Sequence, residues 1–88
     1  MSDQFAGAIR RTRDLQERRR ILKDLNPGLS ELAEIAQDVA VGTKFRADVV
    51  KAIASSGKGE AVNTLLDLIQ DDDATVAVTA VAGLGCLA

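Results

Sequence analysis

Arginines are the most concentrated residues with chemical potential in this 88-residue sequence, and they gather near the N-terminus. Residues 1–23 hold seven Lys and Arg residues against three acidic ones. Such a cluster could bind nucleic acid by displacing the counterions of its phosphates. On a helix, however, these cations fall on two sides, and carboxylates lie four residues from several of them, as helical ion pairs require. We therefore expect a solvated or salt-bridged segment in which Arg10, Arg13 and Arg20 form a charged rim or contact an acidic partner.

The run from Asp71 to Asp73 is the second cluster of polar groups. Three carboxylates could hold a divalent cation, but a calcium loop spaces its ligands along the chain, whereas consecutive residues point in different directions. A carboxylate at a helix N-terminus also accepts hydrogen bonds from free backbone N–H groups and complements the helix dipole. We expect Asp73 to cap a helix in this way, and we expect no metal site.

Catalytic constellations are missing from the sequence. The chain has no His, which is the commonest general base, and its single cysteine, Cys86, therefore lacks the His partner that activates a thiol nucleophile. The run from Ser55 to Gly59 does not have the spacing of a phosphate-binding loop. We predict that the protein is not an enzyme and holds no cofactor.

Turn-forming residues divide the chain into five segments whose lengths suit helices. The dividing residues are Asn26-Pro27-Gly28, Gly42, the loop 55–59 and Asp71–Asp73. Segment 1–25 is expected to be one basic helix, and Thr43 is expected to cap the third segment. Apolar residues recur every three or four positions in the later segments, as in helices that bury one face.

An internal repeat relates the second and third segments to the fourth and fifth. At one constant offset along the chain, Leu32, Ile35, Ala36 and Val39 reappear as Val62, Leu65, Leu66 and Ile69. At an offset one position longer, Phe45, Val49 and Ile53 reappear as Val76, Ala80 and Leu84. A period of about 30 residues with two helices per unit is typical of an α-solenoid. We predict repeat 1 over 29–57 and repeat 2 over 59–88.

The run from Leu65 to Val76, followed by Ala80 and Gly83-Leu84-Gly85, resembles a HEAT-like repeat of the kind found in phycobilisome lyases. In that family the first helix ends in an Asp-rich turn, and the second helix begins with a Val. An Arg commonly follows this Val, whereas here the residue is Ala77. The resemblance implies a helical repeat fold that serves as a protein-docking surface. It also allows a second interpretation, a bilin-lyase-type subunit or chromophore chaperone.

The last segment, residues 74–88, contains no charged residue. A surface helix normally has one apolar and one polar face, and solenoids normally end in a helix with a polar outer side. We therefore expect an apolar contact surface here, used for a homodimer or for another protein. Its expected residues are Val76, Val78, Val81, Leu84 and Leu87. The alternative is that segment 1–25 folds over this helix.

Taken together, these features predict a single all-α domain, a short α-solenoid of about two helix-turn-helix HEAT-like repeats preceded by an N-terminal basic helix. The predicted function is a non-catalytic protein-interaction scaffold or adaptor that self-associates through its last helix. An electrostatic nucleic-acid binder is the remaining alternative. A single cysteine fits a reducing, cytoplasmic location. The sequence has no run of 18 apolar residues, so we expect no membrane span.

Overall fold

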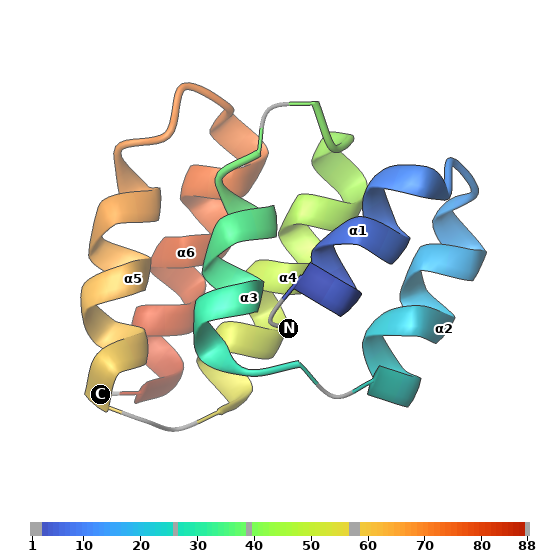
Figure 1. Ribbon diagram of the computed structural model, residues 1–88. Coiled ribbons are helices and arrows are strands. Elements are labelled where there is room, and N and C mark those ends of the chain that lie inside the picture. The colour runs from blue at the N-terminus through green and yellow to red at the C-terminus, as the bar shows by residue number, and fades with distance from the viewer. Residues whose placement is uncertain (1–2, 26, 39, 57–58, 88) are drawn as a thin grey trace.

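The computed structural model describes residues 3–25, 27–38, 40–56 and 59–87, and the side chains of Asp3, Cys86 and Leu87 lie outside that description. The described residues form six α-helices and no β-strand (Figure 1). The helices are α1 (Asp3–Arg11), α2 (Leu15–Leu25), α3 (Leu29–Ala36), α4 (Thr43–Ser55), α5 (Gly59–Ile69) and α6 (Ala74–Leu87). The all-α fold class expected from the sequence is confirmed.

The N-terminal segment forms two helices, so the single helix expected over residues 1–25 is wrong. At 100° per residue, Phe5 and Ile9 would lie about 110° around a straight helix from Leu15 and Leu22. With the break, Phe5 and Ile9 are buried, and Leu15 and Leu22 pack half-buried against the same core. The break at residues 12–14 is held by hydrogen bonds. Arg18 Nε donates to the carbonyl oxygens of Ile9 (3.2 Å) and Thr12 (2.6 Å), which lie at the end of α1.

The beginnings of α4 and α6 show two different ways to start a helix. Asp73 Oδ1 accepts hydrogen bonds from the backbone N–H of Thr75 (2.9 Å) and of Val76 (3.4 Å), which confirms Asp73 as the cap of α6. Gly42, not Thr43, occupies the cap position of α4, and it offers no side-chain bond. The Thr43 hydroxyl instead donates to the Asp73 carboxylate, which links the starts of these two helices.

The helices lie in two rows, as Figure 1 shows. In one row α3 packs between α1 and α5, and in the other α4 packs between α2 and α6. Consecutive helices also pack in pairs, so the chain builds three hairpins side by side: α1–α2, α3–α4 and α5–α6. The hairpin α5–α6 therefore lies at one end of the molecule and α1–α2 at the other.

One apolar core runs through all three hairpins. Its largest fully buried side chains are Phe5, Ile9, Ile35, Val41, Phe45, Val49, Val50, Ile53, Leu65, Leu68 and Val76. The first hairpin contributes to this core mainly through α1, because α2 has no buried residue. Helix α6 contacts α4 and α5, and among the described residues no part of α1 or α2 reaches it. The alternative that segment 1–25 covers the last helix is therefore wrong.

Candidate functional site

Among the side chains that the structure describes, three large apolar ones are exposed on the hairpin α5–α6. Val78 and Val81 on α6 are 66% and 54% exposed, and Leu66 on α5 is 49% exposed. We call Leu66, Val78 and Val81 the end surface. Single exposed apolar residues are ordinary, but a group of them at one end of a molecule is typical of an interaction site.

The other residues expected at the apolar contact surface have different positions. Val76 is fully buried between the rows of helices, so including it in a contact surface is wrong. At 100° per residue it lies about 140–160° around α6 from Val78 and Val81, on the side that packs against the core. Leu84 is half-buried and packs against the core cluster, and the Leu87 side chain lies outside the described residues.

The residues that match the end surface at the sequence offsets of the predicted repeat are buried. One repeat before Leu66 stands Ala36, and one repeat before Val78 and Val81 stand Ala47 and Val50. These earlier residues are 0%, 8% and 0% exposed. Each residue of the end surface therefore corresponds to a residue of the preceding hairpin that is buried in the structure.

Arg46 is a residue whose importance the sequence analysis missed. It is buried, its Nε donates to the carbonyl oxygen of Ala36 (2.9 Å), and its Nη2 donates to the Asp71 carboxylate in the turn between α5 and α6. Its Nη1 also lies 4.0 Å from Asp73 Oδ2. The sequence contained a signal for this role. Phe45 and Val76 occupy matching positions of the two predicted repeats, and the residue that follows is Arg46 in the first but Ala77 in the second. The last hairpin thus lacks the arginine that ties the second hairpin to the third.

The residues expected to form a charged rim are spread over the first hairpin. Arg10 forms ion pairs with Glu34 (3.0 Å) and Asp38 (2.9 Å) of the next hairpin. The hydrogen bond between the side chains of Arg10 and Asp38 is the main cause of two shifts: it lowers the pKa of Asp38 and raises the pKa of Arg10. Arg20 pairs with Glu17 of its own helix. Arg13 is exposed and lines a cavity of about 340 Å³ with Arg18 and Lys44.

Two of the three aspartates in the α5–α6 turn, Asp71 and Asp73, have structural partners. Asp71 pairs with Arg46, and its Oδ1 accepts a hydrogen bond from the backbone N–H of Asp73 (2.8 Å). The Thr43 hydroxyl is the main cause that lowers the pKa of Asp73, and the backbone N–H groups of α6 add to it. Within the described ranges, no group of His, Cys, Asp and Glu side chains could hold a metal ion.

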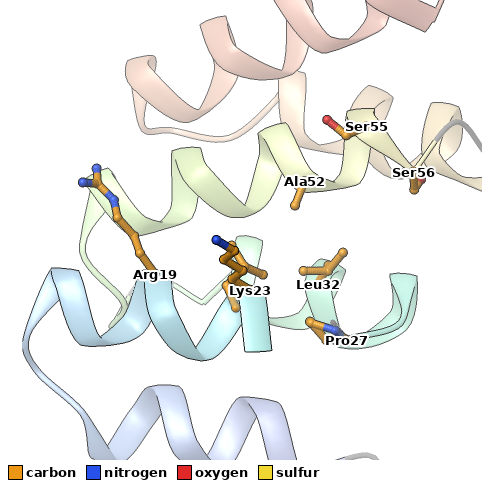
Figure 2. Close-up of a pocket in the computed structure, with 8 residues that line it drawn as sticks. Arg19, Lys23, Pro27, Leu32, Ala52, Ser55 and Ser56 are labelled. Atoms are coloured by element: carbon orange, nitrogen blue, oxygen red, sulfur yellow. The ribbon is translucent and has the colours of Figure 1, made fainter. Parts of the chain in front are cut away.

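Two grooves flank α4. The α2–α4 groove has a volume of about 480 Å³, and its lining residues are Arg19, Leu22, Lys23, Pro27, Leu32, Ala52, Ser55 and Ser56. Figure 2 shows Ala52 of α4 pointing down toward the level of Lys23 and Leu32, while the Arg19 side chain extends to the left of the view. The α4–α6 groove has a volume of about 520 Å³ and is lined by Lys51, Ala54, Ser55, Val78, Thr79, Ala82 and Gly83. Ser55 lines both grooves, so they open on adjoining sides of one helix.

Comparison with known proteins gives no assignment: no family model, no curated protein and no solved structure matches this chain. Among the described helices, none is long and apolar enough to cross a membrane. The function must therefore be argued from the surfaces described above.

Proposed function

We propose that this protein is a non-catalytic protein-interaction module, a short α-solenoid of HEAT-like hairpins that self-associates through the end surface. The observation that carries the proposal is the exposure of Leu66, Val78 and Val81 at positions that are buried one hairpin earlier. Covering an apolar surface lowers the free energy of association by about 25 cal/mol per Å² of apolar area removed from water.

The two ends of the molecule differ, and the difference favours a closed dimer. The outer hairpin α1–α2 is polar, with exposed Gln16, Arg20, Lys23 and Asp24 on α2. The end surface, by contrast, lies mainly on a helix without any charged residue. Head-to-tail stacking would cover apolar side chains with charged ones, which costs desolvation. Two copies that meet end surface to end surface bury apolar groups on both sides, and such a twofold contact closes at the dimer.

The contacts of the arginines favour this function over nucleic-acid binding. Arg10, Arg19 and Arg20 form ion pairs with carboxylates of the same chain, and Arg18 binds backbone carbonyl oxygens. The carboxylates offset the positive charge of Arg10, Arg19 and Arg20, and the carbonyl contacts occupy the Nε donor of Arg18. The chromophore-lyase alternative rests on the sequence resemblance alone, and no contact described above favours it.

Light scattering over a concentration series tests the proposal. We expect the mass to rise from that of one 9.3 kDa chain towards twice that value at high micromolar concentration. The double variant Leu66→Asp/Val81→Asp should remain monomeric, because each partner would then bury unpaired carboxylates. Leu25→Asp is the matched control, because Leu25 is an exposed leucine of the opposite hairpin. Far-UV circular dichroism shows whether each variant is folded.

A wild-type chain that stays monomeric throughout this range would overturn self-association. So would a folded Leu66→Asp/Val81→Asp variant that still forms the dimer. Higher oligomers that grow with concentration would contradict the closed twofold arrangement.

A further inference from the structure

A second surface of this protein combines positively charged side chains with apolar side chains that line two grooves. It shares only Val78 with the end surface among the described residues. It consists of the α2–α4 groove and the α4–α6 groove, which adjoin at Ser55. Apart from Val78, the proposed self-association uses none of the residues that line these grooves. An occupant of the two grooves would cross α4 and contact three consecutive helices of one row.

The charges that line the two grooves have one sign. Arg19, Lys23 and Lys51 line them, and no Asp or Glu is among the described lining residues. Arg19 Nε already pairs with Asp48 on α4 at 2.6 Å. Lys23 and Lys51 form no ion pair with any described side chain, so their ammonium groups are available to a ligand. This local positive charge contrasts with the net charge of −2 on the whole chain.

Apolar groups lie beside these cations. Leu22, Leu32 and Ala52 line the α2–α4 groove, and Ala54, Val78 and Ala82 line the α4–α6 groove. Gly83 lets α6 approach α4 closely at the second groove, because a Cβ there would lie 2.9 Å from the Cβ of Ala54. A ligand that fits both features needs apolar groups for the floors and negative groups for the rims.

We propose that these grooves bind an acidic amphipathic segment of a partner protein. Its apolar side chains contact the floors, and its carboxylates pair with Lys23 and Lys51. A helix with leucines three and four residues apart presents such an apolar stripe, and its glutamates flank that stripe on both sides. Nucleic acid fits less well, because phosphates gain nothing from an apolar floor and no aromatic side chain is among the described lining residues for base stacking.

Fluorescence anisotropy with a defined probe tests this proposal. The probe is a labelled helical peptide of about 14 residues, made of Leu, Ala and Glu with the leucines at helical spacing. We expect saturable binding that weakens as salt screens the ion pairs. A scrambled peptide of the same composition and a single-stranded oligothymidine are the comparison ligands, and both should bind more weakly.

Charge reversal locates the site. The variant Lys23→Glu/Lys51→Glu should bind the helical peptide about tenfold more weakly, because two attractive contacts become repulsive. Arg11→Glu/Lys44→Glu is the matched control: it makes the same charge change at exposed cations that line neither groove, and it should bind like the wild type. The monomeric Leu66→Asp/Val81→Asp variant should also bind normally, which separates this site from self-association.

Three results would overturn the acidic-segment proposal. The first is the absence of binding to the helical peptide at high micromolar protein concentration. The second is equal binding of the scrambled peptide, or equal weakening by the two charge-reversal variants. The third is tighter binding of the oligothymidine that is lost in Lys23→Glu/Lys51→Glu, which would assign the surface to nucleic acid instead.

Discussion

The buried guanidinium of Arg46 on α4 donates a hydrogen bond to the carboxylate of Asp71, 25 residues later, in the turn that joins α5 to α6. The same side chain donates to the carbonyl oxygen of Ala36 at the end of α3. Arg46 therefore connects both helices of its own hairpin to the turn of the next one. This contact and the apolar core together join the third hairpin, which carries the end surface, to the second.

Removal of the Asp71 carboxylate should destabilise the fold strongly. Asp71→Ala removes the carboxylate that is hydrogen-bonded to the buried guanidinium and leaves only Asp73, at 4.0 Å, as a charged neighbour. We expect the free energy of unfolding to fall by about 3 kcal/mol. Glu17→Ala removes the exposed pair with Arg20 and should cost less than about 1 kcal/mol. Urea unfolding followed by far-UV circular dichroism measures both, since the chain has no Trp or Tyr to report by fluorescence. Equal losses would contradict the structural role of Arg46.

Two glycines of α6 should respond in opposite ways to the same substitution. A Cβ at Gly83 would lie 2.9 Å from the Cβ of Ala54, whereas a Cβ at Gly85 would meet no atom within 4 Å. Gly83→Ala should therefore be destabilising by about 1 kcal/mol, as overpacking outweighs the gain in helix propensity. Gly85→Ala should stabilise the helix by about 0.5–1 kcal/mol. Thermal unfolding of both variants at low protein concentration gives the comparison, and a stabilised Gly83→Ala variant would refute the close helix contact.

The free energy of unfolding should fall at acid pH, because the carboxyl groups of Asp38 and Asp73 become protonated there. The pKa values of Asp38 and Asp73 lie below their ordinary value of 3.8, so each group stabilises the fold above that pH. This stabilisation is lost as the pH falls through the folded-state pKa values, so we expect the free energy of unfolding to drop from about pH 5 towards about pH 2. Asp73→Asn should flatten this dependence, and Asp72→Asn removes one carboxylate from the same turn as a control. A dependence that is unchanged in Asp73→Asn would contradict the prediction.

Neighbouring valines of α6 should differ in their effect on stability. Val76 is fully buried and Val78 is mostly exposed. Val76→Ala should cost about 2 kcal/mol, because it opens a small cavity in the core. Val78→Ala should stay within about 0.5 kcal/mol, as is usual for surface positions. Urea unfolding at a concentration where the protein is monomeric measures both values, and a similar cost at the two positions would show that Val78 is covered.

The sequence alone determined the helical class, the turns at Gly28, Gly42 and Asp71–Asp73, and the apolar character of the last helix. It also contained the signal for the break after α1, since Phe5 and Ile9 do not share a face with Leu15 and Leu22. That signal was outweighed by the continuous run of charged, helix-favouring residues, which suits one long helix equally well.

Only the tertiary structure decided which apolar residues of α6 point outward. Polar residues normally mark the outer face of a helix, and α6 has no charged residue to mark it. Packing against α4 and α5 therefore separated buried Val76 from exposed Val78 and Val81. The partners of Arg46 and the grooves beside α4 were decided in the same way, because they join residues far apart in the chain whose proximity no local pattern encodes.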